Sequence, residues 1–233
     1  MKVLMVADGR SPITRRWIQG LLAMEYEVSL VSTYPCQPLE RISRLEVLPV
    51  AFGALGGSQT LRTGTPQSSS SGLMRAVVSR FRPLFMAGRY YFGPASLKNE
   101  QQKYLALVNE IKPDLVHALR IPFEGMLAAC TPVDIPMIVS IWGNDLTFHA
   151  QGSYLMREHT RRTLARANAL MADAGRDIRL AHAWGFANDK PSALVPGNGG
   201  IDLSLIPHRE RRTLPFIKNL IPSRAEMVVN PRG

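Results

Sequence analysis

The feature that most constrains the fold of this sequence is a regular alternation of short apolar runs with longer segments that can form helices. The runs are five to seven residues long, and several are rich in Val, Ile and Leu, as buried strands of a parallel sheet are. They are residues 2–7, 27–32, 44–50, 114–119, 136–142, 169–173 and 192–196. Strands that alternate with helices predict a doubly wound, mostly parallel Rossmann-like α/β sheet with helices on both faces.

The segments between the runs carry helix signals. Ser11 can cap a helix and Pro12 suits its first turn, and apolar residues then recur at four-residue spacing at Ile13, Trp17 and Leu21. Further helices are expected at residues 98–111, 122–130, 154–168 and 175–184.

Two segments interrupt this alternation, the first inside the predicted domain and the second at its end. Residues 53–72 are rich in Gly, Ser and Thr and are predicted to form a mobile loop. Residues 204–226 contain three prolines and a basic cluster, and are predicted to be a linker. We therefore expect one compact domain over residues 1–203, with residues 227–233 beginning another domain.

The composition narrows the class of partner. With 45% hydrophobic and 20% charged residues, the 233-residue chain reads as a globular protein. Its net charge of +10 favours anionic partners. Because the arginines are spread over several elements rather than gathered on one helix or strand, nucleic acid is the least favoured of these partners.

No segment predicts secretion, a metal site or a membrane span. The apolar start of the chain is short and fits a buried strand better than a signal peptide, so a cytoplasmic protein is expected. Cys36 and Cys130 lack metal-ligand spacing, and we expect free thiols and no metal.

Candidate ligand-binding residues follow the predicted strands, because ligands of open parallel sheets gather at the carboxyl ends of the strands. Gly9 and Arg10 follow the first strand, where a helix start could hold an anion or a sugar hydroxyl, although a plain turn explains them equally well. His117 lies late in the predicted strand 114–119, and Arg120 and Glu124 follow just beyond the end of that strand. This trio is the candidate catalytic group, and the alternative is that His117 is an ordinary core residue.

Two further loops carry candidate binding residues. Gly143, Asn144 and Asp145 form a polar turn beside Trp142 that could hold a sugar, or could serve only as turn and cap residues. Asn198 and Gly199 lie in "PGNGGID", where closely spaced glycines predict a binding loop or a hinge.

The basic amphipathic segment 72–93 has two interpretations. It mixes aliphatic and aromatic residues with four arginines, which suits an anionic membrane surface. It also fits an ordinary helix that covers the sheet, and Pro83 is expected to break or kink a helix there.

Taken in order, the motifs resemble the N-terminal domain of a family 4 (group 1) glycosyltransferase of the two-domain GT-B fold. The resemblance rests on "VADGRSPITRRW", "IKPDLVHALRIPFEG", "VSIWGND", "ARANALMADAGRDIRLAHAWGF" and "ALVPGNGGIDL", which together extend over residues 1–203.

This resemblance implies a function. Such enzymes transfer a sugar from a nucleotide-sugar donor to a glycan or lipid-linked acceptor, with retention of configuration and without an essential metal or cofactor. The N-terminal domain binds the acceptor. By position, the cleft residues are Gly9 and Arg10 facing the donor phosphates, His117 as the first histidine of an HxH motif, the turn Gly143–Asp145, and Asn198 with Gly199 in the hinge.

The sequence departs from the family pattern in two places that bear on activity. Leu119 stands where the second histidine of HxH is expected, so Arg120 or Glu124 is the candidate replacement. No second series of strands and helices follows residue 203, so the C-terminal donor-binding domain is missing and we expect this chain alone to be inactive. The alternative is a stand-alone Rossmann-like module that binds a sugar or phosphate without catalysis.

Overall fold

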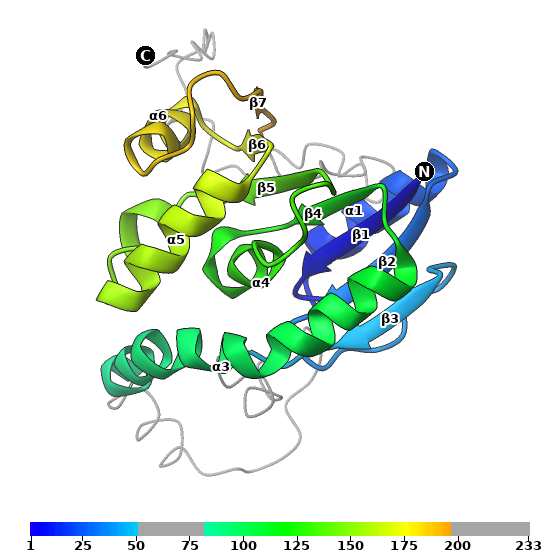
Figure 1. Cartoon of the computed structure of the whole chain (residues 1–233), viewed down its shortest axis with the longest axis horizontal. Helices are drawn as coiled ribbons and strands as arrows, with labels where there is room; N and C mark the ends of the chain where they lie inside the picture. Colours follow the sequence, from blue (N-terminus) through cyan, green and yellow to red (C-terminus); the bar gives the residue numbers. More distant parts are fainter. Residues whose placement is uncertain (51–81, 197–233) are drawn as a thin grey trace, which may run out of the picture. The chain divides into compact units, whose positions relative to one another are not determined.

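Among the residues that the structure describes, the sheet has seven parallel strands, as the alternation predicted. The computed structural model describes residues 1–50 and 82–196. The strand order is β3-β2-β1-β4-β5-β6-β7 (Figure 1). The strands are β1 (Lys2–Ala7), β2 (Glu27–Ser32), β3 (Arg44–Val47), β4 (Leu115–Ala118), β5 (Met137–Ile141), β6 (Ala169–Ala172) and β7 (Ser192–Leu194).

The helices also follow the predicted order. They are α1 (Pro12–Ala23), α3 (Arg82–Ile111), the π-helical turn η1 (Ile121–Gly125), α4 (Met126–Ala128), η2 (Asp145–His149), α5 (Tyr154–Arg166) and α6 (Gly175–Ala183). The predicted helix at 122–130 is a π-helical turn followed by a single α-helical turn. The segments 53–72, 204–226 and 227–233, together with Asn198 and Gly199, lie outside the described residues.

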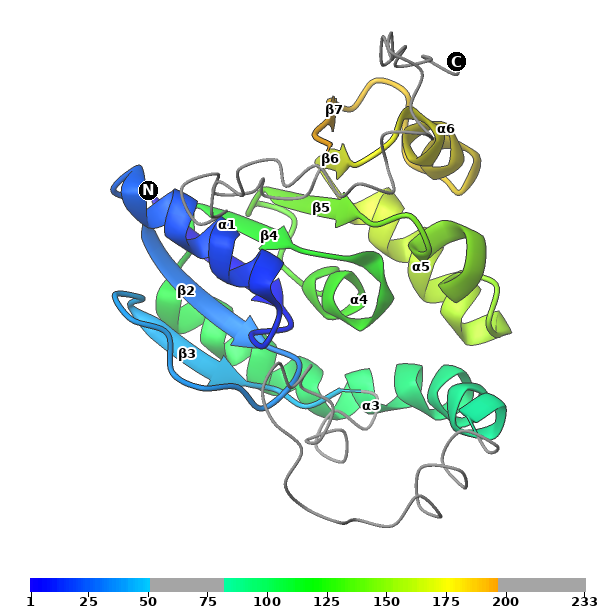
Figure 2. The ribbon, with the colours of Figure 1, turned by 180° about the vertical axis from the view of Figure 1, so that it is seen from behind.

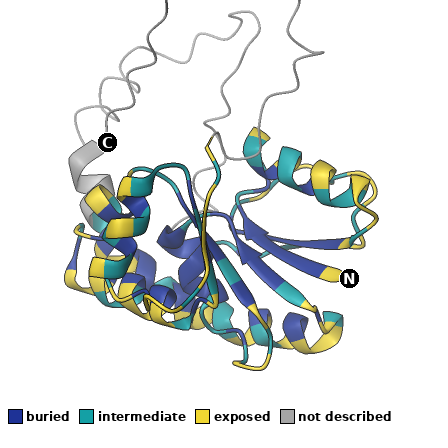
Figure 3. Cartoon of the chain, turned by 90° about the horizontal axis from the view of Figure 1, so that it is seen from above, coloured by how far each residue is buried: buried dark blue, intermediate teal, exposed yellow. Residues whose placement is uncertain are grey.

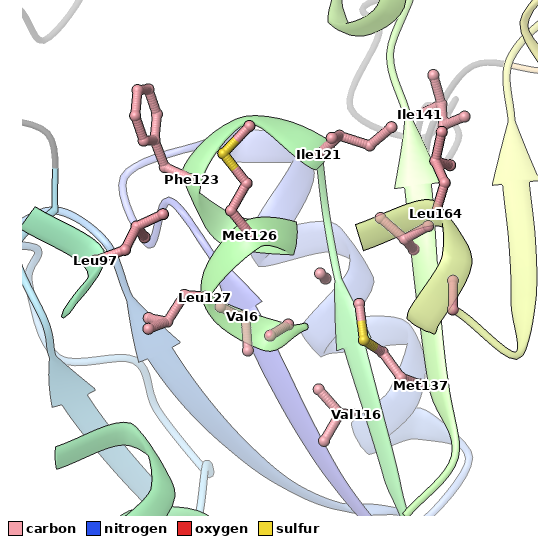
Figure 4. Packing of buried hydrophobic residues seen from close by; sticks show 14 of the residues in the cluster. Val6, Leu97, Val116, Ile121, Phe123, Met126, Leu127, Met137, Ile141 and Leu164 are labelled. Atoms are coloured by element: carbon pink, nitrogen blue, oxygen red, sulfur yellow. The ribbon is translucent and has the colours of Figure 1, made fainter. Parts of the chain in front are cut away.

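Alternating side chains of the central strands form two cores, one on each face of the sheet. Val3 and Met5 of β1 pack in a cluster with Ile18 of α1. Leu4 and Val6 belong to the larger cluster, which includes residues of α3, α4 and α5. Figures 1 and 2 show α1 and α3 on opposite faces of the sheet, and Figure 4 shows the larger cluster from close by. Buried residues follow the strands, whereas the outer sides of the helices are exposed (Figure 3).

Helix α3 begins earlier than predicted and contains an interior proline. It starts at Arg82 rather than at residue 98, so Pro83 occupies the first turn, where proline is tolerated, and does not break the helix. Pro94 lies inside the helix and has no N–H for the carbonyl of Tyr90. The hydroxyl of Ser153 donates to that carbonyl at 2.8 Å.

Ser153 has a second function, because it is also the N-cap of α5. Its hydroxyl oxygen accepts a hydrogen bond from the Met156 N–H at 3.1 Å. The same side chain thus satisfies an unpaired carbonyl of α3 and an unpaired N–H of α5.

The strand order places a topological switch point between β1 and β4. On one side of this point the chain continues from β1 to β2, and on the other side it continues from β4 to β5. Strands β1 and β4 themselves pair in parallel, with Val6 opposite Ala118. In open parallel sheets, ligands bind at the carboxyl ends of the strands at such a point. A ligand-binding site is therefore expected at the loops after β1, β2, β4 and β5.

Candidate functional site at the sheet edge

His117 is a core residue of β4. Its side chain is 4% exposed, its Nε2 lies 2.9 Å from the Ser140 hydroxyl, and its ring packs edge-on against Trp17 at 5.1 Å. Burial lowers the pKa of His117 to about 4. The imidazole is therefore neutral near pH 7, and its contacts belong to strand β5 and helix α1. They match the core interpretation, and its predicted catalytic role stays a prediction.

Arg120 and Asp145 connect the loops after β4 and β5. The Asp145 carboxylate is fully buried and accepts hydrogen bonds from Arg120 Nε at 3.2 Å and Nη2 at 2.9 Å. It also accepts from the backbone N–H groups of Ile121 and Trp142. Burial raises the pKa of Asp145, and Arg120 and the two N–H groups oppose that rise. Asp145 thus holds the two loops together from inside the protein.

The loop after β4 has an unusual backbone. Arg120 has a φ of 151° and Phe123 a φ of 69°, both in a region that side-chain-bearing residues seldom adopt. The hydrogen bond from Ile121 N–H to Asp145 holds this conformation in place. The Arg120 guanidinium lies 5.2 Å from the ring of Trp142. Strained backbone of this kind concentrates at binding sites, because the surrounding contacts must impose it.

Glu124 is buried in the same loop. Its carboxylate accepts a hydrogen bond from the Thr33 hydroxyl at 2.7 Å, which joins the loops after β4 and β2. Burial raises the pKa of Glu124, opposed mainly by the charge of Arg120. Arg120 and Glu124 are therefore neighbours, as predicted, but each is held by a different partner.

Gly9 and Arg10 follow β1 as expected. The Gly9 N–H donates to the Ser32 hydroxyl at 3.0 Å, and a Cβ at this position would lie 2.5 Å from the Cys36 sulfur. The space beside the Gly9 backbone is thus occupied by side chains of the protein itself. Arg10 is paired with Asp8 at 2.9 Å, and its guanidinium stacks 3.9 Å from the ring of Tyr34.

Gly143 and Asn144 directly precede η2. The Gly143 carbonyl accepts from the Thr147 hydroxyl and from Arg176 Nη2. Asn144 is the N-cap residue of η2, but its side chain makes no capping hydrogen bond and is exposed. Of the predicted turn, Asp145 is therefore internal, whereas the Asn144 side chain is accessible.

The structure adds residues that the motifs did not single out. Tyr34 follows β2, and its hydroxyl accepts a hydrogen bond from Arg89 of α3 at 2.6 Å. His149 of η2 lies 2.8 Å from the Tyr90 hydroxyl, and burial, Arg120 and Arg89 lower its pKa to about 4. Tyr34 could have been found from its position directly after a strand. Arg89 and His149 required the tertiary structure.

In the described residues, the predicted site residues coincide neither with a group of metal ligands nor with a large hollow. Within residues 1–50 and 82–196, no three His, Cys, Asp or Glu side chains gather in a way that could hold a metal. No helix in the same ranges is long and apolar enough to cross a membrane. One hollow of about 460 Å³ lies between α1 and residues 38–41, and another of about 550 Å³ lies among α3, α4 and α5. Neither contains a predicted site residue.

Comparison of the sequence with known protein families gives a match. Residues 68–174 match the family described as glycosyl transferase 4-like, a stretch that includes the loops after β4 and β5. Comparison with curated proteins gave no match.

Comparison with solved structures gives loose matches. The UDP-N-acetylglucosamine 2-epimerase of Rickettsia bellii has a TM-score of 0.49 at 10% identity, over 83% of this chain and 44% of that one. The UDP-GlcNAc 2-epimerase of Neisseria meningitidis has a TM-score of 0.46 at 13% identity, over 83% and 45%. A spinosyn rhamnosyltransferase has a TM-score of 0.41 at 15% identity, over 87% and 52%. The chain thus spans about half the length of these structures, and scores this low carry no argument about function.

Proposed function

We propose that the chain is the acceptor-side domain of a glycosyltransferase. Its motifs predicted this resemblance, and its residues 68–174 match the glycosyl transferase 4-like family. In this proposal a retaining, metal-independent enzyme transfers a sugar from a nucleotide-sugar donor to a glycan or lipid-linked acceptor. The observation that carries the proposal is the position of the matched segment, because it supplies Arg120 and Asn144 at the switch point of the sheet.

The described residues suggest separate roles for these two side chains. Arg120 is about one-third exposed, and Asp145 fixes its direction, so it can present N–H donors to a ligand without reorganisation. The accessible Asn144 amide can bond sugar hydroxyls. Neither residue is a nucleophile, which agrees with the expectation that catalysis needs groups from a donor-binding domain.

A chimaera tests this proposal. The chain alone should show no sugar transfer, whereas the chain joined at its C-terminus to the donor domain of a family 4 glycosyltransferase should transfer that domain's sugar. In the chimaera, Asn144→Ala should lower kcat/KM by about tenfold, the loss expected for one or two ligand hydrogen bonds. The matched control is Asn188→Ala, at an exposed asparagine outside the site. A chimaera that folds but transfers no sugar to any acceptor tested would refute the proposal.

Calorimetry separates the enzyme from a stand-alone binding module. If most nucleotide contacts belong to a donor domain, the chain alone should bind nucleotide sugars only weakly, with Kd in the millimolar range or above. Micromolar binding by the chain alone would favour the stand-alone sugar- or phosphate-binding module instead.

We also propose that the first half of α3 touches an anionic membrane at the cytoplasmic face. Tyr91 and Phe92 are 60% and 65% exposed, and Phe148 and Tyr154 on neighbouring elements are exposed as well. Aromatic side chains next to basic residues suit the headgroup region of a bilayer. Co-sedimentation with vesicles should increase with the anionic lipid fraction and fall when Tyr91 and Phe92 are both replaced by serine. Binding that is independent of anionic lipid would rule this part out.

A further inference from the structure

Two arginines from distant parts of the chain meet at one tyrosine ring. The Arg10 guanidinium lies 3.9 Å from the centroid of Tyr34, and the Arg89 guanidinium lies 5.9 Å from the same centroid. Arg89 Nη2 also donates to the Tyr34 hydroxyl at 2.6 Å. These residues come from the loop after β1, helix α3 and the loop after β2, so they gather beside the switch point.

Arg89 is the second cation of this cluster. In the described part of the chain, no Asp or Glu lies within ion-pair distance of it, whereas Arg10 is paired with Asp8. Its Nε is buried and has no hydrogen-bond acceptor among the described residues. Its guanidinium also lies 4.7 Å from the ring of Phe123, an apolar neighbour. A partly buried guanidinium in such surroundings is costly unless an anion accompanies it.

The nearby acid is held by another partner. The Glu124 carboxylate is close enough to interact with the charge of Arg89, but it accepts its hydrogen bond from the Thr33 hydroxyl and forms no ion pair with Arg89 in the described part of the chain. Tyr34 can supply a donor instead. Its oxygen accepts from Arg89, which leaves the hydroxyl hydrogen for another acceptor, and burial raises the pKa of Tyr34, so the phenol stays protonated at neutral pH.

We propose that Arg89 and Tyr34 bind a phosphate group of a ligand that enters the site at the switch point, beside Arg10. Phosphate oxygens accept from guanidinium and phenol donors at once, and Arg is the side chain best suited to them. This inference rests on the proposed function for the identity of the ligand as a glycosyltransferase substrate. The phosphate site itself can be measured without any transfer.

The test is titration of the whole chain with inorganic phosphate, followed by ³¹P line broadening or calorimetry in chloride buffer of constant ionic strength. The chain should bind phosphate saturably. Arg89→Gln should weaken binding by about tenfold or more, and Tyr34→Phe by about three- to tenfold, the loss expected for hydrogen bonds to a charged ligand. Arg157→Gln on α5 removes one exposed charge away from this cluster and should leave the Kd unchanged.

The source of the phosphate is settled by competition. A hexose 6-phosphate that displaces inorganic phosphate better than a nucleoside diphosphate does would assign the group to the acceptor, and the reverse order would assign it to the donor. The proposal is refuted if the chain does not bind phosphate saturably, or if Arg157→Gln weakens binding as much as Arg89→Gln.

Folding controls keep these results interpretable. Circular dichroism of each variant should match that of the unmodified chain, and Tyr34→Phe, which keeps the ring, serves if Arg89→Gln does not fold. A chain that binds phosphate while the chimaera fails to transfer sugar would refute the proposed function and leave the phosphate site standing. If the chimaera transfers sugar but phosphate binding does not depend on Arg89, the phosphate site is refuted and the proposed function stands.

Discussion

The buried histidine of β4 should make the fold sensitive to acid, and replacing it should remove much of that sensitivity. The pKa of His117 is lowered from 6.5 to about 4 in the folded chain by burial. In the unfolded chain the imidazole is exposed and takes up a proton as the pH falls through 6.5. The folded state does not take up that proton until about pH 4, so stability is present at neutral pH and is lost as the pH falls.

The size of the effect follows from these two pKa values. Between pH 7 and pH 5, His117 alone should reduce the free energy of unfolding by about 2 kcal/mol. In His117→Gln, which cannot titrate but keeps a polar group near Ser140, the difference between the two pH values should be smaller by that amount. The assay is urea unfolding at pH 7 and pH 5, with Trp17 beside His117 as a fluorescence reporter.

Ser140→Ala is the control, since it removes the hydrogen-bond partner of His117 and keeps the titrating ring. It should lower stability by about 1 kcal/mol at both pH values and leave the difference between them nearly unchanged. Equal pH differences in the unmodified chain and in His117→Gln would refute this reasoning. His117 would then be accessible to protons, as an acid–base catalyst must be.

Three further substitutions test the supports of the site. Glu124→Gln should raise Tm by about 3 °C at pH 8, because it removes a buried charge whose raised pKa destabilises the fold above that pKa, and the gain should vanish in acid. Asp145→Ala should cost about 3 kcal/mol in urea unfolding, because it leaves Arg120 and two backbone N–H groups without their acceptor. Gly152→Ala should cost about 1–3 kcal/mol, since its Cβ would lie 2.4 Å from the ring of Tyr90.

Each of these has a result that would contradict it. A Tm gain for Glu124→Gln that persists at pH 4 would show that its charge is not the cause. An Asp145→Ala variant as stable as the unmodified chain would mean that water replaces the carboxylate. For Gly152, the control is Gly20→Ala on α1, where a Cβ meets no atom within 4 Å. That change should stabilise the fold by about 0.5–1 kcal/mol, and a loss similar to that of Gly152→Ala would argue against a steric cause.

The strands were predictable because each is a local pattern. Every expected apolar run contains a strand, and the order of elements implied a parallel sheet with the candidate site residues at its carboxyl ends. The start of α3 was not predictable in the same way. Proline ends a helix when its missing hydrogen bond is uncompensated, and the compensation for Pro94 comes from Ser153, a residue of another helix.

The roles of the site residues were less accessible from sequence. A polar residue after a strand can point into the protein or toward a ligand, and only tertiary contacts decide between the two. Asp145 points inward to four donors, whereas the adjacent Asn144 is exposed. Arg89 was expected on a membrane-facing or solvent-facing helix, but its side chain contacts Tyr34 and Phe123 instead.

The hydrogen bond between Ser153 and Tyr90 also makes a mechanical connection across the site. One helical turn of α3 carries both Arg89 and the carbonyl that Ser153 holds, and the segment from η2 to Ser153 carries His149, which contacts the Tyr90 hydroxyl. Two hydrogen bonds to Tyr90, one at its hydroxyl and one at its carbonyl, therefore join η2 and the N-cap of α5 to the turn of α3 that carries Arg89.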